Sequence, residues 1–513
     1  MSFEIAFVLI CMGAMLAALV CDVMRPGMIM LSVVVIFLCA GIITPKEMLE
    51  GFSNKGMITV AMLYLVSEGI RQSGALGQLI KKLLPQKKTT VFKAQLRMLP
   101  TISFISAFLN NTPVVVIFAP IIKRWADSVK LPATKFLIPL SYVTILGGIC
   151  TLIGTSTNLV VHGMILEAGY EGFTMFELGK VGIFIAVAGI LYLFAFSSKL
   201  LPDVRKDSAE VEEELEEQKG NLHRVEAVLG PRFPGINKRL KDFNFKRHYG
   251  AEVKEIKRGG QSITENLENR YLREGDTLVV MADDSFIQTW GESSVFVMIA
   301  NGKDNEPAPG RRKRWLVLMI VGATVGELPF VKEAVPDMQL DMFFFVSITT
   351  IIMAWTKIFP PRKYTKYISW DVLITIACAF AISKAMVNSG VADLVARYII
   401  GLSDHYGPHV LLAAVFIITN LFTELITNNA AAALAFPLAL SISTQLGVSP
   451  VPFFVVICMA ASASFSTPIG YQTNLIVQGI GNYKFTDFVR IGLPLNIITF
   501  LISVFLIPVI WPF

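Results

Sequence analysis

The stretch that decides the fold occurs twice in the chain: Phe108-Leu109-Asn110-Asn111-Thr112-Pro113, and Leu425-Ile426-Thr427-Asn428-Asn429-Ala430. Each copy lies in the middle of a long apolar run, 98–122 in the first case and 410–442 in the second. Asparagine is costly in lipid because its amide leaves strong donors and acceptors without partners. The two copies therefore predict two helical hairpins whose tips meet partway across a membrane and form a binding site.

The composition of the whole chain agrees with a membrane protein. Of its 513 residues, 54% are hydrophobic and only 16% are charged, and the mean hydropathy is +0.60. Apolar runs of the length that a bilayer demands recur along both ends of the sequence. The net charge of +6 needs no nucleic acid to explain it, since membrane proteins gather Lys and Arg in cytoplasmic loops.

Two sets of segments recur with an offset of about 316 residues. Segment 53–74 aligns with 369–390, and 151–163 aligns with 467–479, where both copies contain Gly-x-x-Thr-Asn-Leu. We interpret each copy as five spans with a re-entrant hairpin and a broken helix. Because five is odd, the second repeat must be inverted relative to the first, and both termini are predicted outside.

The charges between the spans support this arrangement. Segment 71–97 carries only basic charges, which predicts a cytoplasmic position, and the acidic segment 167–177 is predicted outside. Positions 201–311 have a different character, with short alternating segments and turn signals typical of a small cytoplasmic α/β domain. The predicted organisation is membrane repeat one at 1–200, an acidic linker at 201–221, the cytoplasmic domain at 222–300, a linker at 301–311 and membrane repeat two at 312–513.

Helices that stop inside a membrane create binding chemistry. Their freed carbonyl and N–H groups can hold a cation or an anion. Sodium prefers several hard oxygens, which Asn and Thr side chains and open carbonyls supply. An anionic substrate prefers N–H donors, which Asn amides and helix N-termini supply. Paired hairpins and paired broken helices therefore predict a secondary transporter with a site near the membrane midplane.

At these positions the chain resembles the divalent anion/sodium symporter family of the ion transporter superfamily, which has a Ser-Asn-Thr signature at each hairpin tip. The corresponding signatures of this chain are Asn110-Asn111-Thr112 and Thr427-Asn428-Asn429, so Asn110 replaces a serine and Asn429 replaces a threonine. The family's Pro-Pro of the broken helices is also replaced, by Ser156-Thr157 and Gln472-Thr473. The resemblance implies a homodimeric symporter in the cell (inner) membrane that carries a small divalent anion with sodium by an elevator movement.

The resemblance also implies site residues, position by position. The first sodium site would use Ser106, Asn110, Asn111 and backbone near Gly154, and the second would use Thr423, Thr427, Asn428 and backbone near Gly470. The substrate would lie between Asn111, Thr112, Asn428 and Asn429, close to Thr155 and Tyr471.

The middle segment resembles the C-terminal regulator-of-potassium-conductance (TrkA-C) domain, on Ile256-Lys257-Arg258-Gly259-Gly260 and Leu272-Arg273-Glu274-Gly275-Asp276. This resemblance implies a regulatory domain that dimerises and binds a small ligand such as a cyclic dinucleotide. Lys254, Lys257 and Arg258 are the candidate phosphate partners. Transporters that carry such an insert are often assigned to sulfate, which makes sulfate the first expected substrate.

Other functions compete with this one. A sodium-coupled dicarboxylate transporter is the first alternative, and a proton-coupled antiporter or exporter of the same superfamily is the second. The second needs essential carboxylates in the core, and Glu424 is equally a proton-linked group or a buried structural acid. A potassium channel would need a repeated Thr-Val-Gly-Tyr-Gly filter, and an enzyme would need a motif such as H-E-x-x-H, G-x-S-x-G or a P-loop; the chain has none of these. The sequence therefore predicts no enzyme and no metal other than sodium.

Overall fold

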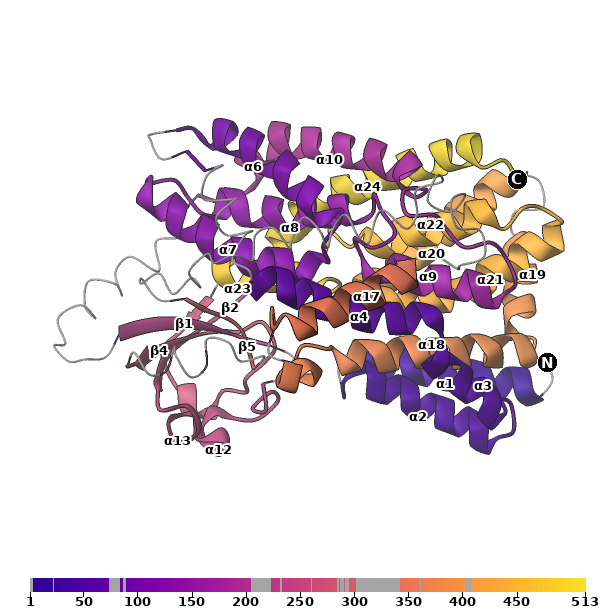
Figure 1. Cartoon of the computed structure of the whole chain (residues 1–513), viewed down its shortest axis with the longest axis horizontal. Helices are drawn as coiled ribbons and strands as arrows, with labels where there is room; N and C mark the ends of the chain where they lie inside the picture. The colour runs from indigo at the N-terminus through magenta and orange to yellow at the C-terminus, as the bar shows by residue number, and fades with distance from the viewer. Residues whose placement is uncertain are drawn as a thin grey trace.

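The computed structural model describes residues 3–21, 23–72, 84–85, 89–203, 223–230, 233–259, 261–283, 286, 290, 295–300, 342–359, 361–401 and 407–513. Most of the acidic linker, the linker at 301–311 and the expected start of repeat two at 312–341 lie outside the described residues. The described part is mostly helical, with one small sheet in the middle of the chain, as predicted (Figure 1).

The first half of the chain begins with helices of 18 and 14 residues, followed by short connecting elements and a further helix of 18 residues. A hairpin and a broken helix come next. The elements of this half are α1 (Phe3–Val20), α2 (Pro26–Cys39), α3 (Pro45–Glu50), η1 (Gly51–Ser53), α4 (Lys55–Gln72), α6 (Val91–Ser106), α7 (Asn111–Ser128), α8 (Thr134–Gly148), α9 (Ser156–Glu167) and α10 (Gly179–Leu200). Helices α6 and α7 form the first hairpin, and α8 and α9 are the two parts of the first broken helix.

The second half has corresponding elements. They are α17 (Met342–Trp355), η4 (Pro361–Lys366), α18 (Trp370–Asn388), α19 (Val391–Gly401), α20 (Gly407–Leu425), α21 (Asn428–Leu446), α22 (Val451–Ser462), α23 (Gln472–Gly481) and α24 (Phe485–Ile510). Helices α20 and α21 form the second hairpin, and α22 and α23 form the second broken helix.

Six helices of the described part are long and apolar enough to cross a membrane, among them α1, α10 and α24. Helix α24 has a lipid-facing character, because an exposed apolar side chain recurs at every fourth position from Leu493 through Ile497, Leu501 and Phe505 to Val509. Residues four apart lie on one face of a helix, and a continuous exposed apolar stripe has no place in water. The chain is therefore a multi-pass membrane protein.

The two broken helices occupy the centre of the molecule. All residues of α8 are buried, and so is every residue of α22 after Val451. A helix that is apolar on all sides must be enclosed by others. Helix α8 packs against α6, α7, α10 and α23, which means that the first hairpin and the second broken helix lie side by side.

The middle segment forms an antiparallel five-stranded sheet. Its elements are β1 (His223–Leu229), α12 (Leu240–Phe243), α13 (Phe245–Tyr249), β2 (Glu252–Arg258), β3 (Gln261–Ile263), η3 (Leu267–Asn269), β4 (Thr277–Ala282) and β5 (Phe296–Ala300). The strand order is β3-β2-β4-β1-β5. The sheet has its own apolar core, built around Phe233, Tyr249 and Phe296.

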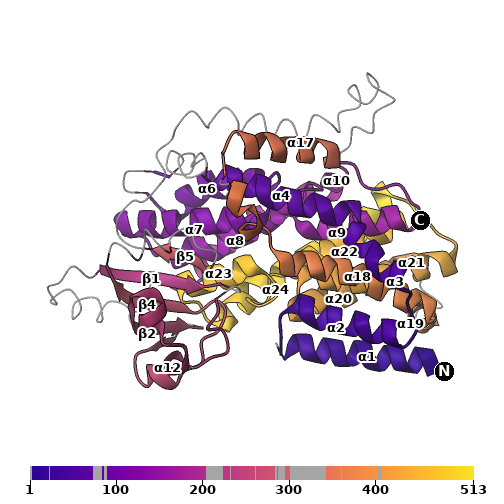
Figure 2. The ribbon, with the colours of Figure 1, turned by 60° about the horizontal axis from the view of Figure 1, so that its bottom comes forward.

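The sheet lies at one end of the helical body, and the two chain ends lie at the opposite end (Figures 1 and 2). The sides of the membrane that the middle segment and the termini face stay a prediction.

Candidate functional site

Each hairpin is closed at its tip by one hydroxyl-to-amide hydrogen bond. In the first hairpin, Ser106 Oγ donates to Asn111 Oδ1 at 2.8 Å. In the second, Thr423 Oγ1 donates to Asn428 Oδ1 at 2.9 Å. Because each pair joins the end of one helix to the start of the next, the bond holds the two helices of the hairpin together where the chain turns.

The first broken helix is fastened to the first hairpin through Thr151. The Thr151 hydroxyl donates to the carbonyl of Ala107, and Gly154 N donates to Thr151 Oγ1 at 3.1 Å. Asn158 Nδ2 donates to the Thr151 carbonyl at 2.9 Å. These bonds satisfy polar groups that the helix break would otherwise leave without partners.

The second broken helix repeats the same three bonds. Thr467 Oγ1 donates to the carbonyl of Glu424 at 3.2 Å, and Gly470 N donates to Thr467 Oγ1 at 3.3 Å. Asn474 Nδ2 donates to the Thr467 carbonyl at 3.1 Å. Each residue of these three bonds lies 316 or 317 positions after its counterpart in the first half. The repeat seen in the sequence is therefore also a repeat of equivalent contacts.

Tyr471 joins the two hairpin tips. Its hydroxyl accepts a hydrogen bond from Asn111 Nδ2 at 2.6 Å and lies 3.1 Å from Thr155 Oγ1. The Asn428 side chain also interacts with the same hydroxyl. Four of the six predicted substrate residues therefore meet at one point.

The other two predicted substrate residues contact the broken helix of the opposite half. Thr112 Oγ1 donates to Gln472 Oε1 at 3.4 Å. Asn429 Oδ1 accepts from Ser156 Oγ at 3.2 Å and from Thr157 Oγ1 at 3.3 Å. In the sequence, Ser156, Thr157 and Gln472 stand out only as departures from the family pattern. Their contacts place them beside the predicted substrate residues.

The side chains that form the site are buried and polar. Asn111 is fully buried, and Asn428 and Asn429 are each 8% exposed. Within the described residues, the hydrogen bonds that join the tips to α9 and α23 involve no charged side chain. Four helices, α7, α9, α21 and α23, begin at this site, and helix N-termini present N–H groups and a positive dipole end to an anion.

Oxygen atoms cluster beside each tip, at the helix ends. A Cβ atom on Gly148 would lie 2.6 Å from Asn111 Oδ1 and 3.1 Å from the Gly154 carbonyl. A Cβ atom on Gly470 would lie 2.5 Å from the Thr423 carbonyl. Such oxygen clusters suit a hard cation such as sodium. The buried Asn158 Oδ1 has no hydrogen-bond partner. Gly148 was absent from the predicted set. A side chain at this position would collide with Asn111 and with the Gly154 carbonyl.

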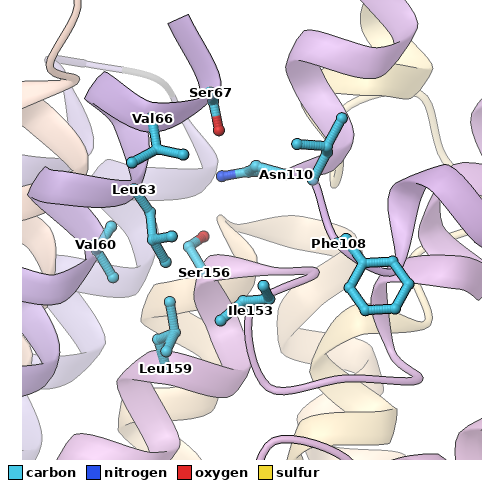
Figure 3. A pocket seen from close by; sticks show the side chains of 10 residues that line it. Val60, Leu63, Val66, Ser67, Phe108, Asn110, Ile153, Ser156 and Leu159 are labelled. Carbon is cyan, nitrogen blue, oxygen red and sulfur yellow. The ribbon is translucent and has the colours of Figure 1, made fainter. Parts of the chain in front are cut away.

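Two predicted sodium ligands lie apart from these clusters. Asn110 is half-buried and points toward Ser67 of α4 in a small pocket (Figure 3), while the Thr427 side chain is exposed. Both residues precede the first turn of their helices without capping it through their side chains. The lining of the pocket consists of Val60, Leu63, Val66, Ser67, Phe108, Leu109, Asn110, Ile153, Ser156 and Leu159. The assignment of Asn110 and Thr427 to sodium stays a prediction.

The predicted phosphate partners of the middle domain are engaged in ion pairs. Lys257 Nζ lies 3.0 Å from Glu226 Oε1, and Arg258 makes two bonds to the Asp276 carboxylate at 2.6 and 2.5 Å. Lys254 pairs with Glu252 at the surface, at 2.6 Å. A ligand at these residues stays a prediction.

The middle domain contacts the hairpin and the broken helix directly. Glu226 Oε2 accepts from Lys123 Nζ of α7 at 2.7 Å. On its other side, a Cβ atom on Gly479 of α23 would lie only 2.8 Å from the Gly275 carbonyl of the domain. The domain is therefore attached to α7 and α23, two of the four helices that begin at the site.

Comparison with known proteins places the chain in a family. The model of the citrate transporter family matches residues 7–434 and, in an overlapping second match, 338–512. The chain belongs to the citrate transporter family. This confirms the resemblance drawn from the hairpin tips at the level of the family, and it confirms that the protein is a membrane transporter and not an enzyme. The TrkA-C resemblance of the middle segment stays a prediction.

Three relatives illustrate the range of this similarity. An uncharacterized transporter of Synechocystis is 29% identical, over 93% of this chain and 92% of its own. A probable sodium/sulfate cotransporter of Chlamydomonas reinhardtii is 30% identical, over 56% of this chain and 32% of its own. A sodium-dependent dicarboxylate transporter of Staphylococcus saprophyticus is 27% identical, over 28% of this chain and 29% of its own.

Proposed function

We propose that this transporter family member is a sodium-coupled symporter of a small divalent anion, with sulfate as the first substrate and a dicarboxylate as the second. The observation that carries the proposal is the meeting of four helix N-termini around Asn111, Asn428 and Tyr471, flanked by two oxygen clusters. The N-termini supply donors for an anion, and the oxygen clusters supply ligands for cations. The names of two relatives, a probable sodium/sulfate cotransporter and a sodium-dependent dicarboxylate transporter, support both the cation and the anion of this proposal.

Sulfate comes first because the site offers neutral donors in a compact space. Neutral hydrogen bonds hold a divalent anion when many N–H groups converge and bound cations balance its charge. A long carboxylate would gain more from a guanidinium, and the described contacts of the site include none.

Competition for labelled sulfate uptake into proteoliposomes tests this order. We expect thiosulfate and molybdate to compete strongly and succinate and citrate weakly. If only succinate and citrate compete, the substrate is a carboxylate and the order is wrong.

We also propose that the hairpins and broken helices move as one body against a dimeric scaffold. The bonds between each hairpin and the broken helix of the opposite half tie these elements together. The scaffold consists of α1, α2 and α17, together with α4 and α18, which lie against them. At the boundary, a Cβ atom on Gly56 of α4 would lie 3.2 Å from Gly163 Cα of α9, a close backbone approach that leaves few side chains to obstruct sliding.

The middle domain is proposed to regulate this movement from the cytoplasm, through its contact with α7. Burial raises the pKa of the Glu226 carboxyl. The neighbouring Lys123 and Lys257 lower the pKa by more than burial raises it, so that it falls to about 2. A lowered pKa means that the ion pairs stabilise the contact fully above the ordinary glutamate pKa of about 4.3 and lose this effect as the pH falls toward about 2. The contact is therefore intact at neutral pH.

Glu226→Gln should weaken the attachment of the domain to α7 and change the uptake rate by about twofold or more at neutral pH. The difference from wild type should shrink as the pH falls from about 4 toward about 2, because protonation of the detached Glu226 carboxyl then competes with its ion pairs. Glu252→Gln is the matched control, because Glu252 forms an exposed pair with Lys254 away from the helices. Initial rates in proteoliposomes measure the effect; equal rates for all three proteins would leave the domain without control over transport.

A further inference from the structure

The two halves differ at two pairs of equivalent positions beside the hairpin tips. Glu424 occupies the place that Ala107 has in the first half, since the carbonyl of each accepts from the threonine of its broken helix. Ser464 likewise occupies the place of Gly148, 316 positions earlier. The second oxygen cluster therefore has a carboxylate and a hydroxyl where the first has a methyl group and a hydrogen atom.

The Glu424 carboxylate is held by neutral donors. Its Oε1 accepts from Ser466 N at 2.9 Å and from Asn496 Nδ2 at 2.7 Å, and its Oε2 accepts from Ser464 Oγ at 3.3 Å. Asn496 is 7% exposed, and its Oδ1 has no hydrogen-bond partner.

No ion pair to Glu424 occurs in the described part of the chain. Tyr142 of α8, a phenol that donates to the Phe465 carbonyl, interacts electrostatically with Glu424. A carboxylate inside a membrane without a counter-charge is expensive, which makes it a candidate for a functional role.

A single hydroxyl connects this carboxylate to the second oxygen cluster. Ser464 Oγ lies 3.3 Å from Glu424 Oε2 and 3.4 Å from the Thr423 carbonyl. A Cβ atom on Gly470 would lie 2.0 Å from the same hydroxyl oxygen. Thr423 and Gly470 are the residues assigned to the second sodium site by the family resemblance, so the carboxylate lies just behind that site.

We infer that Glu424 is the counter-charge of the second sodium site and acts on it through Ser464. The inference rests on the proposed sodium coupling and adds an asymmetry to it. A negative charge a few ångströms from a bound cation attracts it strongly in a medium of low dielectric constant, and groups behind the ligands orient them. The second site therefore binds sodium more tightly than the neutral first site and fills first. The bound cation in turn supplies the counter-charge that Glu424 otherwise lacks.

Sodium titrations of the purified, full-length protein test this inference by two readouts, thermal stabilisation in detergent and the half-maximal sodium concentration for uptake. Glu424→Gln should raise the sodium concentration required in both by about tenfold to hundredfold, the range typical when a group behind a metal ligand is removed. The shift should appear in both readouts, and Glu424→Asp should restore part of the sodium affinity. Glu167→Gln is the matched control. It also removes a carboxylate, but one that forms an ion pair with Lys384 on α18, so the sodium titration should match that of wild type.

Ser464→Ala provides an independent variant in case Glu424→Gln fails to fold, and we expect it to raise the required sodium concentration by about threefold or more. Unchanged sodium dependence in either folded variant would overturn the inference. Loss of uptake with an unchanged sodium titration would also overturn it, because a merely structural role gives that result. If sodium neither stabilises the wild-type protein nor drives its uptake of the anion, the proposed function itself is refuted.

Discussion

Asn111→Ala is expected to abolish anion uptake, and Asn428→Ala is expected to do the same. Each asparagine accepts a hydrogen bond from the hydroxyl that closes its hairpin tip. Each also interacts with the Tyr471 hydroxyl between the tips. Alanine removes both interactions with buried polar partners, at about 1–3 kcal/mol each, and it removes an oxygen from the predicted sodium site. Two lost partners correspond to a loss of about a hundredfold or more in transport at fixed substrate concentration.

The measurement is labelled sulfate uptake by purified protein, with size-exclusion chromatography to show that each variant is folded. Asn388→Ala is the control, since this asparagine bonds to Ile42 and Glu47 at an exposed position away from the tips. Uptake near the wild-type rate in either site variant would mean that the tips do not form the binding site.

Joining α9 to α18 is expected to stop transport completely. Glu167 Oε1 of α9 lies 3.5 Å from Lys384 Nζ of α18, at the proposed boundary between the moving body and the scaffold. In a background without the native cysteines, Glu167→Cys and Lys384→Cys can be bridged by a bifunctional thiol reagent. Because the two helices must slide past each other in each cycle, a covalent bridge should hold the protein in one state, and a reductant that cleaves the bridge should restore uptake.

The control bridge joins Glu47→Cys to Asn388→Cys, whose side chains are hydrogen-bonded within the scaffold at 3.1 Å. This bridge should leave transport unchanged. Unimpaired uptake after complete cross-linking of the first pair would rule out the sliding movement.

The hairpins could be predicted from the sequence because polar clusters inside apolar runs have few physical solutions. The tips were expected at 110–112 and 427–429, and the chain turns between Ser106 and Asn111 and between Leu425 and Asn428. The short alternating segments expected within 201–311 likewise include β1, β2 and β4, because alternating apolar residues require one buried face.

The contacts across the two halves could not be predicted in the same way. Repeats show which positions are equivalent, but they do not show that the Tyr471 hydroxyl reaches Asn111, 360 residues away. The family signature placed Asn110 and Thr427 at the tips correctly, yet side-chain direction depends on packing, and Asn110 points into the pocket beside α4. The ion pairs of Lys257 and Arg258 could not be predicted for a similar reason. Glu226 lies on β1, which β4 separates from β2, and Asp276 directly precedes β4.

Sodium-gradient uptake into proteoliposomes tests the central claim most directly. Purified protein is reconstituted, labelled sulfate is added outside, and uptake is compared with sodium or choline as the external cation at equal ionic strength. We predict accumulation of sulfate above the external concentration in sodium, collapse of this accumulation when a sodium ionophore is added, and no accumulation in choline. Equal uptake in sodium and in choline would contradict sodium coupling, on which the proposed roles of both hairpin tips depend.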